Sequence, residues 1–154
     1  MRKILKKNQM LTRALSKSDY PQWRTLWDQY LVFYKHELSE TQTQLTFSRL
    51  FDENFNMHGF VLESEGQVLG IAHASFRNST WSENQELYLE DLLVDQSHRG
   101  KGFGRALIEA VANFGKQHGS PKLYWQTHRD NSTAQKLYDS LATKSEFITY
   151  EMPI

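Results

Sequence analysis

A glycine-rich turn between a strand and the clearest helix of the sequence limits most strongly what this chain can fold into. The strand is expected over Glu86 to Val94, where side chains alternate between two faces. The helix begins near Gly102 and ends before Gly119. Its apolar residues keep the helical period: Phe103, Ala106, Leu107, Ala110, Val111 and Phe114. The turn itself reads Arg99-Gly100-Lys101-Gly102-Phe103-Gly104, so a ligand can approach the backbone closely at the start of the helix.

The start of this helix suits an anion. Its first free amides point towards the turn and the helix dipole favours negative charge, so a pyrophosphate is the expected ligand. Arg99, Lys101 and Arg105 add positive charge. A Walker-type phosphate loop is excluded because the motif does not end in Gly-Lys followed by Ser or Thr. The motif is also a poor dinucleotide-binding fingerprint, because its glycines are each two residues apart. On spacing alone, a structural turn without a ligand remains the alternative.

The other elements predict a mixed sheet flanked by helices, of the α/β (α+β) class. A first helix has an aromatic face, and a second over Glu40 to Asp52 buries Leu45, Leu50 and Phe51. This apolar, largely aromatic face consists of Trp23, Leu26, Trp27, Tyr30, Leu31 and Tyr34. Further strands are expected at Met10–Leu15, Phe60–Glu63, Gln67–Phe76, Lys122–Thr127 and Phe147–Met152, and a last helix after Asn131 or Ser132. The predicted order is β-α-α-β-β-β-α-β-α-β.

The alternation along Glu86–Val94 assigns the side chains of this strand to two faces. One face would carry Leu87, Leu89, Asp91 and Leu93, and the other Tyr88, Glu90, Leu92 and Val94. Glu90 and Asp91 are therefore expected to point in opposite directions.

Composition excludes several classes of function. The chain has no cysteine, which rules out disulfides, thiolate metal sites and a cysteine nucleophile. A formal net charge of +0 is atypical of a nucleic-acid binder, and the 6 histidines show no metal-ligand spacing. No apolar run approaches the length of a membrane span. Residues 1–9 form a basic extension without the apolar stretch of a signal peptide, so we expect a cytoplasmic protein with a single domain over residues 10–154.

The turn and its neighbours resemble a known superfamily. Arg99 to Gly104 fits the Arg/Gln-x-x-Gly-x-Gly/Ala signature of the GCN5-related N-acetyltransferases, abbreviated GNAT. Leu87 to Val94 resembles the fourth strand of the spermidine/spermine type and of small histone- and amino-acid-acetylating members. Tyr124 to Thr127, Asn131, Ala134 and Leu137 to Asp139 resemble the fifth strand and fourth helix of the same set. The resemblance covers about residues 10 to 152 and is dense from Leu87 to Asp139.

The resemblance implies a site for acetyl-CoA as cosubstrate. The fourth and fifth strands would splay apart to hold the pantetheine arm, with backbone groups near Leu93 and Val94 pairing with it. The amides of Arg99, Gly100, Lys101, Gly102, Phe103 and Gly104 would hold the pyrophosphate. Asn131 would hydrogen-bond the cofactor, a role compatible with a plain helix cap. A long final hairpin of many members is missing after the fourth helix, so either part of the sheet edge is short or a partner subunit completes it. A homodimer is expected by analogy.

Acetyl transfer to an amine needs two proton movements: the ammonium must lose a proton, and the departing thiolate needs a proton or a strong hydrogen bond. By resemblance, Glu90 is the base and Tyr138 the acid. The alternatives are a salt-bridged carboxylate for Glu90 and an ordinary core aromatic for Tyr138. Asp91 is expected to anchor the strand. With no cysteine available, the simple mechanism is direct attack within a ternary complex.

The acceptor pocket is predicted from aromatic and acidic residues that suit a cationic amine. Its candidates are Tyr30, Tyr34, His73 and Trp81; for the first three the alternative is an ordinary core position. The leading hypothesis is acetylation of a primary amine on a small molecule such as a polyamine or an amino acid. The alternatives are a protein lysine or N-terminus as acceptor, or a CoA-binding module without catalysis.

Overall fold

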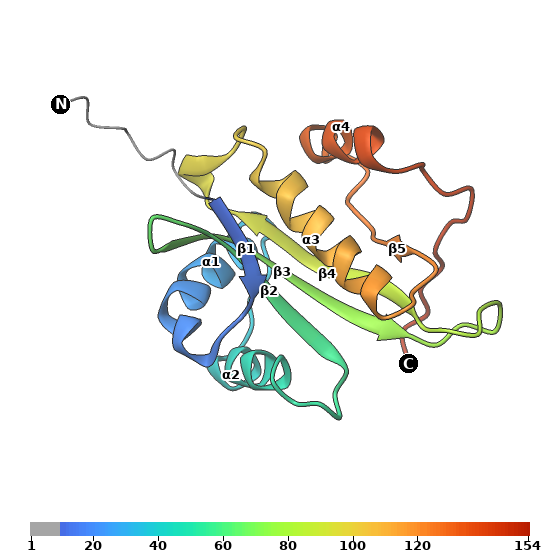
Figure 1. Ribbon diagram of the computed structural model, residues 1–154, viewed down its shortest axis with the longest axis horizontal. Coiled ribbons are helices and arrows are strands. Elements are labelled where there is room, and N and C mark those ends of the chain that lie inside the picture. Colours follow the sequence, from blue (N-terminus) through green and yellow to red (C-terminus); the bar gives the residue numbers. More distant parts are fainter. Residues whose placement is uncertain (1–9) are drawn as a thin grey trace.

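The computed structural model describes residues 10–154, so the basic extension expected over residues 1–9 lies outside the described residues. A five-stranded sheet has the order β1-β2-β3-β4-β5 (Figure 1). The strands are β1 (Met10–Ala14), β2 (Met57–Ser64), β3 (Gln67–Arg77), β4 (Glu86–Val94) and β5 (Leu123–Tyr124). Neighbouring strands from β1 to β4 are antiparallel, whereas β5 runs parallel to β4. The predicted mixed sheet is confirmed.

Helices cover both faces of this sheet (Figure 1). One face carries α1 (Tyr20–Phe33) and α2 (Glu40–Arg49), and the other carries α3 (Phe103–Gln117). After β5 the chain forms α4 (Ser132–Leu141). Short 3-10 turns occupy Lys17–Asp19 and Gln96–His98. In the part of the chain that the structure describes, no helix is long and apolar enough to cross a membrane.

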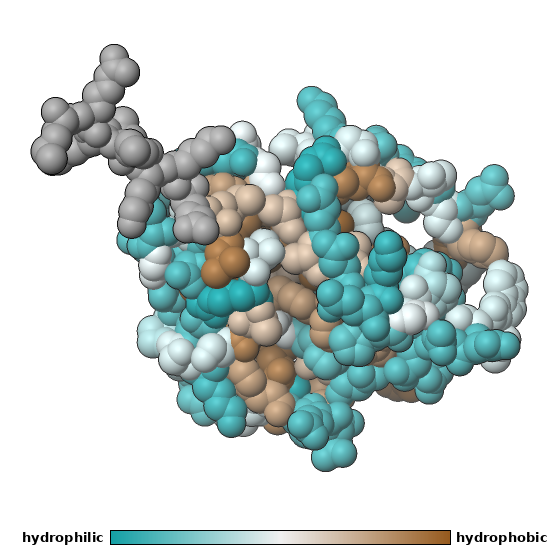
Figure 2. Space-filling view, in the orientation of Figure 1, coloured by the Kyte–Doolittle hydropathy of each residue, from teal (hydrophilic) through white to brown (hydrophobic). Residues whose placement is uncertain are grey.

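The sheet separates two apolar cores. On one face, Trp23, Leu26 and Trp27 of α1 pack against Val61, Ile71 and Leu93. On the other, Leu107, Ile108 and Val111 of α3 pack against Leu62, Leu87 and Leu89. Full burial of such a side chain contributes roughly 1.5–3 kcal/mol. The side of the molecule in Figure 2 is mostly hydrophilic, with apolar residues showing along the sheet edge near β1, where Met10 and Leu11 are exposed.

An extra residue interrupts the alternation of β4. His73 of β3 lies opposite Asp91, and Ala74, the next residue, lies opposite Leu89. Glu90 therefore has no partner of its own and forms a β-bulge, which bends the strand and changes the phase of its side chains.

The change of phase corrects the predicted faces of β4. Leu87 and Leu89 lie in the core beneath α3, and Leu92 and Val94 pack against the same core. Leu93 lies in the core beneath α1. The prediction that Leu87, Leu89, Asp91 and Leu93 share one face is wrong. Because the side-chain period of a strand is two, one extra residue exchanges the faces for everything that follows it.

Two further predictions are wrong. The segment Phe147–Met152 forms no strand; β5 ends at Tyr124, so the edge that another strand could extend is only two residues long. Leu45 of α2 is exposed rather than buried, whereas Leu50 is buried as expected. The buried position on α2 is Thr43, so the helix presents a different stripe to the core from the one predicted.

The strands β4 and β5 separate soon after they meet. They pair only at Leu87 with Leu123 and at Tyr88 with Tyr124. Beyond Tyr88 the β4 backbone continues to Val94 with no strand on that side among residues 10–154. The splay that the family resemblance implies is thus present, and it leaves an open strand edge between β4 and the segment after β5.

A salt-bridge network ties the start of α1 to the sheet. The Arg13 guanidinium donates two hydrogen bonds to Asp19, of 2.8 and 2.9 Å, and one of 2.9 Å to Glu63 on β2. Asp19 also accepts the amide of Ser16 at 2.8 Å, and it is buried. The Arg13 hydrogen bonds lower the pKa of Asp19 and outweigh the opposing effect of burial. The carboxylate therefore stabilises the fold only while it is ionised.

We expect Asp19→Asn to lower the free energy of unfolding at pH 7 by about 1–3 kcal/mol, because the Arg13 hydrogen bonds lose their charged acceptor. Since the folded-state pKa lies below the ordinary 3.8, this contribution is complete above the ordinary value and is lost as the pH falls through the folded-state value. Urea unfolding at pH 7 and at pH 3 measures it. Asp28→Asn, which removes an exposed partner of Arg24, is the control. An equal deficit for Asp19→Asn at both pH values would contradict the role of the charge.

Candidate active site

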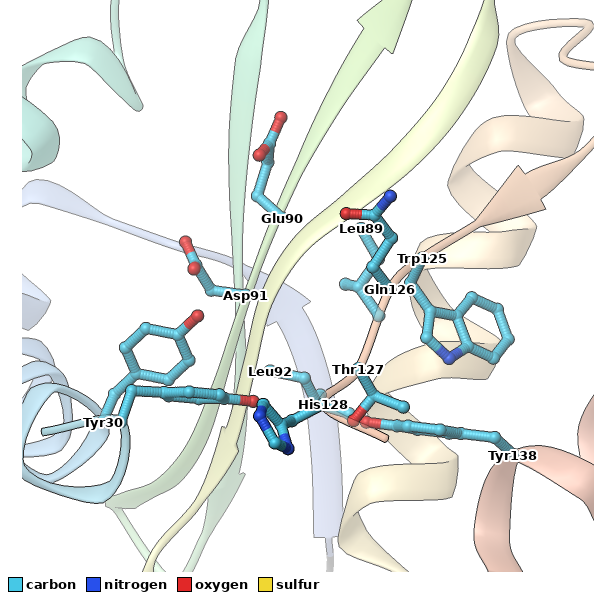
Figure 3. A pocket seen from close by; sticks show the side chains of 11 residues that line it. Tyr30, Leu89, Glu90, Asp91, Leu92, Trp125, Gln126, Thr127, His128 and Tyr138 are labelled. Atoms are coloured by element: carbon cyan, nitrogen blue, oxygen red, sulfur yellow. The ribbon is translucent and has the colours of Figure 1, made fainter. Parts of the chain in front are cut away.

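A cavity of about 300 Å³ opens where β4 and β5 separate (Figure 3). Its wall comes from β4, from the segment after β5, from the C-terminal end of α1 and from α4. The lining residues are Tyr30, Tyr34, Leu89, Glu90, Asp91, Leu92, Trp125, Gln126, Thr127, His128 and Tyr138. The cavity therefore brings together Glu90 and Tyr138, the predicted base and acid, with Tyr30 and Tyr34 from the predicted acceptor site.

Glu90 is held in the cavity wall by two neighbours on β3. Its Oε1 accepts hydrogen bonds from Ser75 Oγ at 2.6 Å and from Arg77 Nη2 at 2.9 Å. Within residues 10–154, its Oε2 receives no hydrogen bond. One oxygen thus fixes the side chain, while the other remains available to a ligand or a water.

Asp91 lies on the same side of β4 as Glu90 (Figure 3). The expectation that these two carboxylates point in opposite directions is wrong, because the bulge at Glu90 places two successive side chains opposite one residue of β3. Burial acts to raise the pKa of Asp91, but the hydrogen bond and the electrostatic interaction with His73, followed by the contact with Tyr30, outweigh burial and hold this pKa below its usual value. The cavity therefore contains two adjacent carboxylates.

The predicted acceptor residues separate into two groups. Tyr30 and Tyr34 line the cavity, and their rings lie 4.7 Å apart. His73 is fully buried behind Asp91 and does not line the cavity, so it offers no surface to an acceptor. Trp81 is 84% exposed in the loop before β4, where it contacts Phe147 rather than the cavity.

The cavity tyrosines are neutral phenols at pH 7. Burial raises the pKa of Tyr30 and of Tyr34, and the negative charge of Asp91 adds to both shifts. Burial also raises the pKa of Tyr138, with a smaller contribution from Tyr34. Tyr138 therefore reaches the cavity as a hydrogen-bond donor, with its ring packed edge-on against Trp125.

The glycine-rich turn adopts a conformation that favours glycine. Gly100 and Gly102 have φ of 78° and 81°, and Gly102 is the N-cap of α3. A Cβ at either position would meet nothing within 4 Å, so these positions need glycine for the dihedral angle rather than for space in this structure. Arg99, Lys101, Phe103 and Gly104 complete the turn, and the exposed side of Arg99 to Gly102 leaves the first amides of α3 open.

The other predicted cofactor residues lie along the same opening. Leu93 and Val94 pair with β3 on one side, and their opposite edge faces the gap left by β5. Since the Leu93 side chain is buried, only its backbone can meet a ligand there. Asn131 caps α4, with its Oδ1 accepting the Ala134 amide at 3.3 Å, so the capping role is present and the side-chain NH2 is left for another partner.

Several cavity residues have no counterpart in the predicted site. Trp125, Gln126 and Thr127 were expected within a strand but line the cavity because β5 ends at Tyr124. The Oγ1 atom of Thr127 is buried without a hydrogen-bond partner within residues 10–154. No group of three or more metal-binding side chains occurs in this part of the chain. These residues could have been assigned to the cavity from their position, because they directly follow a strand that diverges from β4.

Solved structures share this fold over nearly the whole chain. A ribosomal-protein-alanine N-acetyltransferase from Brucella melitensis has a TM-score of 0.79 at 18% identity, covering 95% of this chain and 99% of that one. The aminoglycoside N-acetyltransferase AAC(6')-Iy in complex with CoA has a TM-score of 0.80 at 21% identity, covering 98% and 99%. At these identities the likeness defines the fold, which is that of N-acetyltransferases.

Sequence comparison then gives the family. Residues 17–142 match the Acetyltransferase (GNAT) family, and the chain belongs to it. The D-amino-acid N-acetyltransferase HPA3 of Saccharomyces cerevisiae is 31% identical over 94% of this chain and 91% of its own length. The thialysine N-epsilon-acetyltransferase of Caenorhabditis elegans is 31% identical over 65% of each chain. Acyl transfer to an amine is the activity of this class, as predicted.

Proposed function

We propose that the chain transfers the acetyl group of acetyl-CoA to a primary amine of a small molecule, by direct attack in a ternary complex. One observation supports this most directly: Glu90 and Tyr138 enter the same cavity, beside an open strand edge and a glycine-rich helix start. A carboxylate and a neutral phenol are the two groups that the proton movements of the reaction need. The cavity is at the small end of the usual range for small-molecule sites, which favours a small acceptor over a protein segment.

Three features of the chain support the proposed site for acetyl-CoA. The edge of β4 at Leu93 and Val94 that faces away from β3 can pair with the amides of the pantetheine arm, where the Val94 carbonyl now accepts a hydrogen bond of 3.4 Å from Arg99 Nε. The open amides from Arg99 to Gly104 can bind the pyrophosphate, with the charge of Arg99 and Lys101 nearby. Asn131 can donate its side-chain NH2 from the start of α4. Bound there, the thioester supplies an activated acetyl group next to the cavity.

The proposed proton transfers use one group on each side of the cavity. Glu90, through its free Oε2 and a water, takes the proton that the ammonium must lose before attack. Nitrogen then bonds to the acetyl carbon as the bond from carbon to sulfur breaks, and it releases a second proton, which replaces the one that Tyr138 gives up. Tyr138 donates a hydrogen bond or its proton to the departing thiolate, and the raised pKa of Tyr138 keeps that donor in place at neutral pH. The products are the N-acetylated amine and CoA.

The acceptor is proposed to bind as a cation. Tyr30, Tyr34, Glu90 and Asp91 give the cavity aromatic faces and negative charge, which suit an ammonium group. The names of the relatives point the same way, since a D-amino acid and thialysine both carry an amine. Amino-acid-like amines and polyamines are therefore the first acceptors to try.

The cofactor site is tested by two glycine substitutions of equal strain. Gly102 and Gly66 have φ of 81° and 78°, and an added Cβ meets nothing within 4 Å at either. Both alanine variants should therefore lose similar stability, about 1–2 kcal/mol. Acetyl-CoA at about 100 times its Kd should stabilise the wild-type chain by roughly 2.7 kcal/mol, or several degrees in Tm. We expect Gly102→Ala to lose much of this shift and Gly66→Ala to keep it. No shift of the wild-type chain would overturn the cofactor assignment.

The base is tested by Glu90→Gln, which keeps the size of the side chain but removes its basicity. We expect turnover of the amine at pH 7 to fall by roughly 10²–10⁴-fold. The remaining rate should rise more steeply with pH, because it then depends on the amine that is already deprotonated in solution. Acetyl-CoA binding should stay unchanged. Glu86→Gln is the matched control, since Glu86 lies on the same strand and pairs with Lys122 at 3.4 Å outside the cavity. Unchanged turnover in Glu90→Gln would remove Glu90 from the mechanism.

We also propose a homodimer, on the analogy that the sequence resemblance gives. The segment after α4 supports it, because its apolar side chains are largely exposed in the single chain. They are Phe147, Ile148, Tyr150, Met152 and Ile154. Sedimentation of the wild-type chain should give a dimer, and the double change Phe147→Ser and Ile148→Ser should give a monomer. Val32→Ser, at an exposed position of α1, should remain dimeric. A wild-type monomer at all concentrations would contradict the proposal.

A further inference from the structure

Asp91 is held from behind by a buried chain of two hydrogen bonds. Trp23 Nε1 on α1 donates to His73 Nε2 on β3 at 2.9 Å. His73 Nδ1 lies 2.8 Å from Asp91 Oδ2 on β4. Trp23 and His73 are both 0% exposed, whereas Asp91 faces the cavity. The three side chains thus connect the core beneath α1 to the floor of the site.

The chemistry of the first member fixes the direction of both hydrogen bonds. An indole nitrogen can only donate, so His73 Nε2 must accept and carries no proton. The imidazole is then neutral with its proton on Nδ1, and this N–H donates to Asp91. The contact between His73 and Asp91 is therefore a hydrogen bond from a neutral ring, not an ion pair.

The charge of Asp91 consequently lacks a cationic partner within residues 10–154. Its neighbours are the neutral His73 and the phenols of Tyr30 and Tyr34. The guanidinium of Arg77 is hydrogen-bonded to Glu90. A largely buried carboxylate without a counterion lowers the stability of the fold, unless a bound cation neutralises its charge.

We propose that Asp91 binds the ammonium group of the acceptor, and that Trp23 and His73 are positioning residues that hold this carboxylate towards the cavity. This inference rests on the proposed function, and it divides the work between the two carboxylates. Asp91 selects and holds the protonated amine, and Glu90 removes its proton. The site is then specific for acceptors that arrive as cations, placed between Asp91 and the ring faces of Tyr30 and Tyr34.

The binding role is tested with steady-state kinetics, using thiol release and the best acceptor among D-alanine, L-lysine and spermidine. Asp91→Asn should raise the KM for that amine at least about tenfold, the effect of losing a hydrogen bond to a charged group, with the KM for acetyl-CoA within about twofold of wild type. Glu90→Gln should lower kcat more than it raises the KM for the amine. An unchanged KM for the amine in Asp91→Asn would overturn the inference. Absence of turnover in the wild-type chain with every amine would instead overturn the proposed function.

The positioning role is tested by a matched pair of tryptophan variants. Trp23→Phe keeps an aromatic ring in the stack but removes the donor to His73. Trp27→Phe changes the adjacent ring, 5.5 Å away and stacked at 11°, whose Nε1 is buried without a partner in the described residues. We expect Trp23→Phe to raise the KM for the amine several-fold and Trp27→Phe to leave it near the wild-type value. Equal effects of the two changes would reduce Trp23 to a packing role.

A spectroscopic signature separates positioning from packing. In the wild-type chain and in Trp27→Phe, the imidazole nitrogens of His73 in a ¹⁵N-labelled sample at pH 7.5 should show the proton on Nδ1 alone. In Trp23→Phe the donor to Nε2 is removed, so the proton should no longer be confined to Nδ1 and the two ¹⁵N signals should change. A proton on Nε2 in the wild-type chain would overturn the proposed direction of the two hydrogen bonds.

Discussion

The extra residue at Glu90 in β4 determines how the rest of the site is arranged. Without it, strict alternation would place Glu90 and Asp91 on opposite faces of the sheet. With it, both carboxylates face the side of the sheet that carries α1, next to Tyr30 and Tyr34. The same extra residue lets one strand supply Leu89 to the core beneath α3 and Leu93 to the core beneath α1. One backbone irregularity therefore links the packing of both cores to the placement of the acidic pair.

The early separation of β4 and β5 provides the second requirement, which is backbone free to bind. A sheet normally satisfies its own amides and carbonyls, and an edge with unpaired groups is a liability unless something covers it. Here the edge from Leu89 to Val94 leads from the cavity to the glycine-rich turn at the start of α3. Such an edge offers an extended ligand a continuous series of donors and acceptors, ending at amides suited to an anion.

The parts of this structure set by local periodicity were predictable from the sequence. The 3.6-residue repeats located α1 and α3, and the turn chemistry located the junction of β4 and α3. The bulge was not predictable, because Leu87 to Val94 alternates equally well on either side of a phase change. The position of His73 stayed open between the acceptor site and the core, because a histidine in an apolar strand looks the same in the sequence whether it faces a cavity or supports a carboxylate. The strand expected at Phe147–Met152 failed for a different reason: apolar alternation shows that a segment could pair, not that a partner edge exists.

The two carboxylates of the cavity differ in what neutralises them, and the roles proposed for them rest on this difference. Glu90 receives a hydroxyl and a guanidinium on one oxygen, so much of its charge is already met by the protein. Asp91 receives a neutral imidazole N–H and lies near phenols, none of which carries positive charge. A cation entering the cavity therefore gains more from Asp91, whose field is less compensated. In the proposed mechanism, the free oxygen of Glu90 then accepts the proton that the bound amine must release.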